Sequence, residues 1–131
     1  MNSTGSKTRI AKIGTVIVPV SDQQQAIEFY VEKLGFEKRT DVAMGEHYRW
    51  VEVAPRGADT TIAIVPPREG EPTGVQTGIA LGSDDVDGDH AALAAGGVDV
   101  DDAVSRMGDP VPPMFWFRDP DANSLLIVER R

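Results

Sequence analysis

Residues 13–36 read IGTVIVPVSDQQQAIEFYVEKLGF, and the architecture of the chain follows from this run. Its first part, residues 13–20, is rich in β-branched side chains and has the composition of a strand. Ser21 then predicts the start of a helix, because Gln24 stands three residues later and completes a capping-box pattern. Apolar residues follow at close to the helical period. Gly35 predicts the helix end, since glycine tolerates the left-handed conformation that terminates many helices.

Three further strands are predicted after this helix, at residues 36–39, 48–53 and 60–65. The next segment, PPREGEPT at residues 66–73, is too rich in proline and glycine for a helix or a central strand. The same order of elements then begins again. A strand is predicted at 77–81, a weaker helix at 86–95, and strands at 98–100, 114–117 and 124–129.

An internal repeat relates the two halves of the chain. Residues 15–18 (TVIV) align with residues 78–81 (GIAL), an offset of 63. Residues 62–65 (IAIV) align with residues 125–128 (LLIV) at the same offset. Two separated strands that share one offset indicate a tandem βαβββ duplication.

This duplication sets the predicted domain organisation. A chain of 131 residues has room for one domain. We expect the polar residues 1–9 to form a disordered leader and residues 10–131 to form a single domain. Its predicted parts are module one at 10–66, a linker at 67–75 and module two at 76–131.

The sequence resembles the vicinal oxygen chelate superfamily, which includes glyoxalases, bleomycin resistance proteins and ring-cleaving dioxygenases. Residues 18–22 (VPVSD), 26–30 (AIEFY) and 34–36 (LGF) resemble its first-module signature, and residues 117–123 (FRDPDAN) resemble its late hairpin. That hairpin usually ends in Asp-Gly-Asn, so Ala122 departs from the pattern. The resemblance covers nearly the whole chain. It implies an α+β fold in which tandem βαβββ modules form a curved open sheet, with a concave pocket and helices on the convex side.

The resemblance also bears on metal binding. Metal-using members carry a His or Gln, a Glu, a His and a Glu at four strand positions, and such ligands suit divalent transition metals. In this sequence those positions fall on Thr15, Ala63, Gly78 and Leu126. None of these is a usual metal ligand. We therefore expect neither a metal nor another cofactor at this site.

Strand alternation predicts which side chains line the pocket. In the first strand Thr15 and Ile17 face the pocket while Val16 and Val18 face the helices. In the third strand, the repeat offset pairs Val51 with Met114 and residue 53 with residue 116. The complete predicted lining is Thr15, Ile17, Arg49, Val51, Ala63, Gly78, Met114, Trp116 and Leu126.

The third strand has a second possible register. The offset turns Arg49 and Val51 into the pocket and Trp50 toward the helix, but a single bulge reverses this assignment. In the reversed register the pocket lies around Trp50 and Glu52. For Trp116, the alternative to lining the pocket is a position in the core.

Other chemical motifs are weak. His47 lies near two glutamates and His90 lies among aspartates, and we interpret both as exposed polar residues. No serine stands in a Gly-x-Ser-x-Gly nucleophile elbow, and no glycine-rich segment has phosphate-loop spacing.

Composition excludes several classes of partner. The formal net charge is −8, which repels a phosphate backbone, so we expect no nucleic-acid binding. No apolar run approaches the roughly 20 residues that a membrane span requires, so we expect no membrane partner. The chain has no cysteine, and a cytoplasmic location is the default expectation.

Three hypotheses for function follow. The leading one is metal-independent binding of a small aromatic or amphipathic molecule by an apolar pocket, with the protein as a homodimer. The second is an enzyme of the superfamily, a lyase, isomerase or dioxygenase-like protein, with a metal-free or non-standard site. The third is a ligand-sensing or structural subunit. The sequence leaves the identity of the ligand open.

Overall fold

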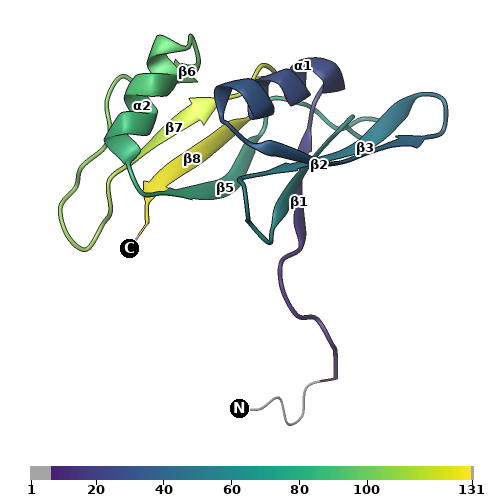
Figure 1. The fold of residues 1–131 in the computed structure, drawn as a ribbon, viewed down its shortest axis with the longest axis horizontal. Helices are drawn as coiled ribbons and strands as arrows, with labels where there is room; N and C mark the ends of the chain where they lie inside the picture. The colour runs from purple at the N-terminus through teal and green to yellow at the C-terminus, as the bar shows by residue number, and fades with distance from the viewer. Residues whose placement is uncertain (1–6, 131) are drawn as a thin grey trace.

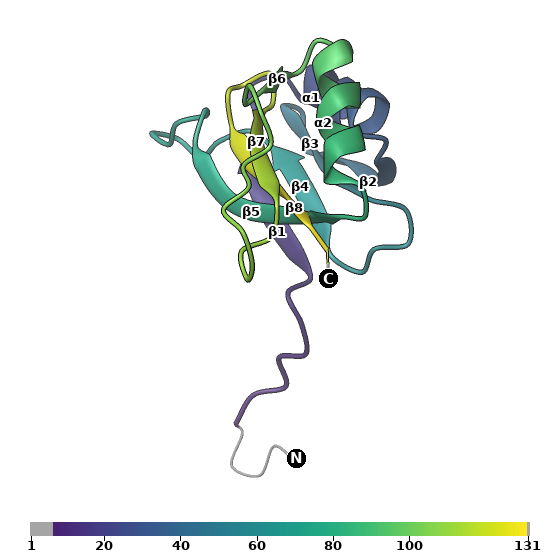
Figure 2. The ribbon, with the colours of Figure 1, turned by 90° about the vertical axis from the view of Figure 1, so that its left-hand side faces the viewer.

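The computed structural model describes residues 7–130 and consists of two four-stranded sheets and their helices (Figure 1). Residues 1–6 of the predicted leader lie outside the described part. Residues 7–14 contain no helix or strand. Residues 12–14 form hydrogen bonds with residues 59–61, and the chain before them extends away from the body of the protein (Figure 2). Within the described residues, no helix has the length and apolarity needed to cross a membrane.

Module one contains six elements in chain order. They are β1 (Thr15–Pro19), α1 (Gln23–Glu28), the π-helical turn η1 (Phe29–Lys33), β2 (Glu37–Met44), β3 (Tyr48–Ala54) and β4 (Thr61–Val65). The strand order is β1-β4-β3-β2, in which β1 runs parallel to β4 and the other neighbours are antiparallel.

Module two repeats this arrangement. It contains β5 (Gln76–Ser83), α2 (Val86–Ala95), β6 (Asp99–Val100), β7 (Met114–Arg118) and β8 (Ser124–Glu129). The strand order β5-β8-β7-β6, with β5 parallel to β8, matches that of module one. The predicted α+β fold of tandem βαβββ modules is therefore confirmed. The exact module boundaries stay a prediction, although residues 66–75 between the sheets form neither helix nor strand.

The start of the first helix differs from the prediction. Asp22, rather than Ser21, caps α1, because its carboxylate accepts a hydrogen bond from the backbone N–H of Gln25 at 3.0 Å. The hydroxyl of Ser21 donates instead to the Asp121 carboxylate of module two at 2.6 Å. The predicted capping box is wrong because a contact between the modules occupies the serine. At the other end Gly35 has φ of 78°, as expected for a helix terminator.

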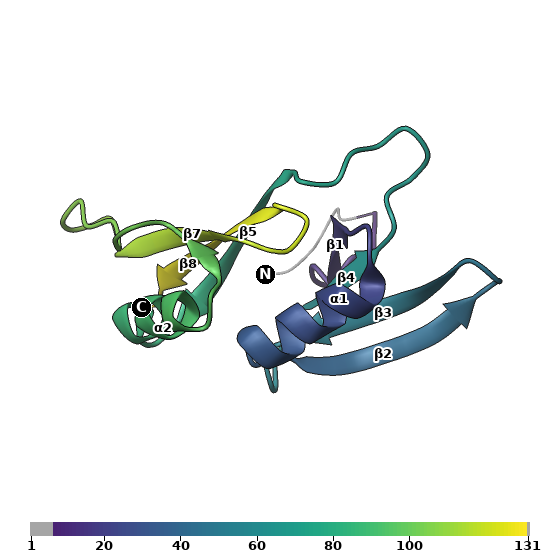
Figure 3. The ribbon, with the colours of Figure 1, turned by 90° about the horizontal axis from the view of Figure 1, so that it is seen from above.

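Figure 3 shows the two modules beside one another, and one hydrophobic core joins them. Val18, which the alternation of the first strand turns toward the helices, and Val20, just after this strand, are fully buried in it. The rings of Phe29 in η1 and Phe117 in β7 stack with their centroids 6.2 Å apart, so the first helix packs on the second sheet. Further members of the core are Ala26, Ile27, Ile62, Ile64, Val86, Leu93, Phe115, Leu125 and Ile127.

A buried hydrogen-bond network lies at the junction of the modules. The hydroxyl of Tyr30, which is 0% exposed, donates to the Asp119 carboxylate at 2.9 Å. Asn123 donates to the same carboxylate from its backbone N–H and from its side-chain amide. The same amide also donates to the carbonyl of Pro19 in β1 at 2.8 Å. The network therefore ties the end of β1 to the late hairpin of module two.

Candidate ligand-binding site

The site is built on the face of the module-one sheet that lies opposite α1. On β3, Val51 and Val53 are 0% exposed and belong to the core, so Trp50 and Glu52 lie on the other face. Arg49 lies on the helix side, where its Nε is 3.2 Å from the Asp41 carboxylate. The predicted register of this strand, which turned Arg49 and Val51 into the pocket, is wrong.

The length of one hairpin explains the error. Val53 pairs with Ile62 across β3 and β4, a separation of 62 − 53 = 9 residues. The equivalent core pair in module two is Phe117 and Leu125, a separation of 125 − 117 = 8 residues. The β3–β4 loop is thus one residue longer than the β7–β8 loop. The offset of 63 that relates β1 to β5 and β4 to β8 becomes 117 − 53 = 64 between β3 and β7, which exchanges the two faces of β3.

Cross-strand pairing gathers the side chains of the site. Glu52 on β3 pairs with Ala63 on β4, and Ala63 pairs with Ile17 on β1. Trp50 lies two residues from Glu52 and therefore on the same face. Thr15 and Ile17 lie on this face as predicted from the alternation of β1, and Ile17 is 57% exposed.

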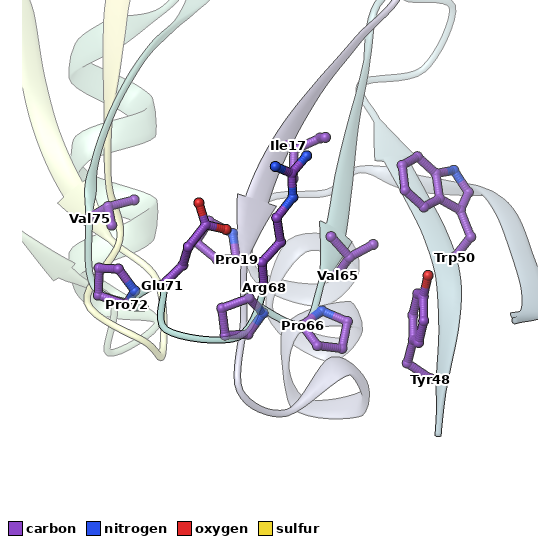
Figure 4. A pocket seen from close by; sticks show the side chains of 11 residues that line it. Ile17, Pro19, Tyr48, Trp50, Val65, Pro66, Arg68, Glu71, Pro72 and Val75 are labelled. Carbon is purple, nitrogen blue, oxygen red and sulfur yellow. The ribbon is translucent and has the colours of Figure 1, made fainter. Parts of the chain in front are cut away.

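A pocket of about 660 Å³ lies on this face (Figure 4). Ile17, Pro19 and Val65 form its apolar floor, and the aromatic rings of Tyr48 and Trp50 form one side. The linker between the modules forms the other side with the residues Pro66, Pro67, Arg68, Glu71, Pro72 and Val75. The linker is therefore part of the site.

A chain of hydrogen bonds crosses three strands beside the pocket. The indole Nε1 of Trp50 donates to one carboxylate oxygen of Glu52, and the hydroxyl of Thr61 donates to the other, both at 2.7 Å. The hydroxyls of Thr61 and Thr15 are 2.9 Å apart. Because Thr61 has a single hydroxyl proton and gives it to Glu52, Thr15 donates to Thr61. The hydrogen bonds from Thr61 and Trp50 lower the pKa of the Glu52 carboxyl below its ordinary value, so it is ionised at neutral pH.

The positions at which metal-using relatives carry ligands do not fit a metal. Thr15 offers a neutral oxygen that takes part in the hydrogen-bond chain, and Ala63 is 0% exposed beside Glu52. Gly78 has no side chain and Leu126 offers no donor atom. Across residues 7–130 there is no cluster of three or more His, Cys, Asp or Glu side chains that could hold a metal ion.

The structure divides the rest of the predicted lining between two other surfaces. Gly78 lies in a separate groove of about 780 Å³ between β1 and β5, which also has Arg56 and Arg130 in its walls. Met114 and Trp116 alternate with the buried Phe115 on β7 and lie on the open face of module two, where Trp116 pairs with Leu126 on β8. Met114, Trp116 and Leu126 line neither the groove between β1 and β5 nor the module-one pocket.

The two histidines remain outside the site. His47 lies in the turn between β2 and β3 and is exposed, as expected. His90 on α2 is half-buried rather than exposed. Its Nε2 lies 2.6 Å from the carbonyl of Asp101, and its ring meets Phe115 edge to face with centroids 4.9 Å apart.

Of the polar chain, the sequence predicts only Thr15 in the pocket, and it predicts no role for Thr61 or for the linker. Trp50 and Glu52 belong to the pocket only in the alternative register. The length of the β3–β4 loop is the sequence feature that could have placed Glu52 correctly. Once Val53 is paired with Ile62 in the core, Trp50 and Glu52 must share the pocket face.

The paired modules and the pocket beside the linker define the class of protein. The chain belongs to the Glyoxalase/Bleomycin resistance protein/Dioxygenase superfamily, whose family model matches residues 12–127.

Individual relatives match over almost their whole length. The antibiotic binding protein TnmS3 from Streptomyces sp. CB03234 is 38% identical, with a TM-score of 0.82 over 95% of this chain and 99% of that one. A superfamily member from Sphaerobacter thermophilus DSM 20745 is 35% identical, with a TM-score of 0.86 over 94% of this chain and 100% of that one. The protein YetH from Bacillus subtilis (strain 168) is 35% identical in an alignment of length 127 that covers 92% of this chain and 99% of YetH.

Proposed function

We propose that this protein binds a small aromatic or amphipathic molecule in the module-one pocket, without a metal. The observation that carries the proposal is the pocket itself, in which two aromatic rings and an apolar floor lie beside the hydrogen-bonded carboxylate of Glu52. Ligand pockets commonly combine apolar walls with a few fixed polar groups. The similarity to TnmS3, an antibiotic binding protein, supports the binding of a small molecule.

The state of Glu52 favours binding over catalysis. A general base works best when its pKa lies near the operating pH. Both oxygens of Glu52 accept strong hydrogen bonds and its pKa is lowered, so it is a weak proton acceptor at neutral pH. The alternative of a lyase, isomerase or dioxygenase-like enzyme therefore gains no activated base from Glu52.

The protein has two tryptophans, which allows a direct test. Trp116→Phe leaves Trp50 as the single reporter, and Trp50→Phe leaves Trp116. Titration with a panel of planar aromatic compounds should change the fluorescence of the Trp116→Phe variant and leave that of Trp50→Phe nearly constant. Mass spectrometry of the recovered compound should show it unchanged. A response confined to Trp116 would move the site to module two, and a converted compound would establish the enzyme.

We further propose that the functional unit is a homodimer. Val42 pairs with Trp50 and Met44 pairs with Tyr48, so the exposed side chains of Val42 and Met44 extend the apolar pocket face along the β2–β3 hairpin. Monomeric proteins rarely expose large contiguous apolar patches. β1 and β5 are also edge strands of their sheets, which proteins tend to cover. A cytoplasmic location remains part of this proposal and can be tested by cell fractionation.

A further inference from the structure

We propose that Glu52 is the charge-recognition residue of the pocket and that the ligand is a planar aromatic cation. The inference rests on the proposed function, because it requires an aromatic ligand beside Trp50. Beyond the proposed function, it specifies the sign of the ligand's charge and the residue that recognises this charge.

The Glu52 carboxylate is held in one position before any ligand arrives. Trp50 donates to one of its oxygens and Thr61 to the other, each at 2.7 Å, and Thr61 is itself held by Thr15. Both donors are neutral. Each carboxylate oxygen keeps further capacity to accept a hydrogen bond, so a protonated amine can be added without breaking the existing network.

Within residues 7–130, no cation pairs with this carboxylate. Arg49, three residues away on the same strand, lies on the opposite face and pairs with Asp41. The linker brings Arg68 and Glu71 to the pocket wall, and their charges offset one another. The pocket and its border therefore carry one uncompensated negative charge.

The aromatic side chains provide a matching surface. The Nε1–H of Trp50 is engaged by Glu52, so a ligand at the pocket meets the indole face rather than its polar edge. A cation over the face of an indole is attracted by the ring quadrupole. A flat ring stacked on Trp50 can place an amino group at its edge next to Glu52, and Tyr48 extends the stacking surface.

The test compares two ligands with one ring system. 9-Aminoacridine is protonated at pH 8, whereas acridine is neutral at this pH. Calorimetric titration of the full-length protein at low salt should show 9-aminoacridine binding at least about tenfold more tightly, a difference of about 1.4 kcal/mol. Glu52→Gln keeps the size and an acceptor oxygen and should remove this preference. Glu28→Gln makes the same change on α1, on the other face of the sheet, and should preserve it.

Each outcome decides the inference. Equal affinity of the wild-type protein for the two compounds overturns the charge assignment and leaves the proposed function intact. A preference that survives Glu52→Gln overturns the role of Glu52. Tighter binding of acridine-9-carboxylate, an anion, would assign recognition to Arg68 instead. Failure of all three compounds to bind would overturn the proposed function together with the inference. The wild-type comparison does not depend on the folding of any variant.

Discussion

The hydrogen bond between Tyr30 and Asp119 should stabilise the junction of the modules by an amount that depends on pH. Tyr30→Phe removes one hydroxyl from a fully buried ring and leaves the ring itself in place. A hydrogen bond to a charged group contributes roughly 1.5–3 kcal/mol. Asp119 keeps three backbone or amide donors, from Asn123 and Asp121. We therefore expect the variant to lose about 2 kcal/mol of unfolding free energy at pH 7.

The alkaline behaviour provides a stricter test. Burial, and then the neighbouring charge of Asp119, raise the pKa of Tyr30 well above its ordinary value of 10.0. Above pH 10 the unfolded chain releases the Tyr30 proton while the folded protein retains it, so the stability that this residue contributes falls as the pH rises. The unfolding free energy of the wild-type protein exceeds that of Tyr30→Phe at pH 7, and this difference should be smaller by about 1.4 kcal/mol at pH 11. The difference between the two proteins should then be about 0.6 kcal/mol.

Urea unfolding followed by circular dichroism measures both quantities. With a urea dependence of about 1–3 kcal/mol per molar, the midpoints at pH 7 should differ by about 1 M. Titrations of both proteins at pH 7, 9, 10 and 11 isolate Tyr30, because every other titrating group is common to the pair. The reasoning is refuted if the two proteins have equal stability at pH 7, or if their difference stays constant up to pH 11.

Three further outcomes are expected. Light scattering should give a mass about twice the 14.1 kDa of the chain, and Met44→Glu should halve it; a mass that is already that of a monomer before mutation would contradict the dimer. Ala122 has φ of 66°, so Ala122→Gly should raise the unfolding free energy by roughly 0.5–1 kcal/mol, because the backbone strain relieved exceeds the conformational entropy lost. Urea titrations measure this change, and a lower urea midpoint for the variant would contradict it. Elemental analysis of protein purified without metal-affinity steps should find no near-stoichiometric Zn, Ni, Mn or Fe, because Thr15 and Ala63 offer no usual ligand; near-unit metal that is lost on mutating neighbouring residues would contradict it.

The fold could be predicted from sequence because its strongest signals are local and repeated. The alternation along β1 predicts the buried face of Val18, and the shared offset of 63 identifies the duplication. The faces of β3 could not be transferred between modules by the same offset. One additional residue in the β3–β4 loop leaves both cores intact but exchanges Val51 with Trp50, and alternation alone cannot detect it.

Other features depend on contacts between residues far apart in the chain. Ser21 has the sequence context of a helix cap, and only its proximity to Asp121, 100 residues away, shows that its hydroxyl is engaged elsewhere. The predicted pocket combined residues of both modules because the resemblance implied one concave face. In the chain, Ile17 lies in the module-one pocket while Trp116 and Leu126 lie on the open face of module two.

The linker wall has a consequence for how ligand range can change. Pro66 and Pro67 fix φ directly after Val65 of the pocket floor, so this part of the wall has few alternative conformations to lose when a ligand binds. Association should then occur in one kinetic step, without a slow closing phase in stopped-flow traces. The two sheets share one core, so a substitution in the core of one sheet affects the packing of both. The linker belongs to neither sheet. Substitutions, insertions or deletions between β4 and β5 can therefore reshape the mouth of the pocket while both cores remain intact, and recombination of linkers among relatives would vary selectivity separately from folding.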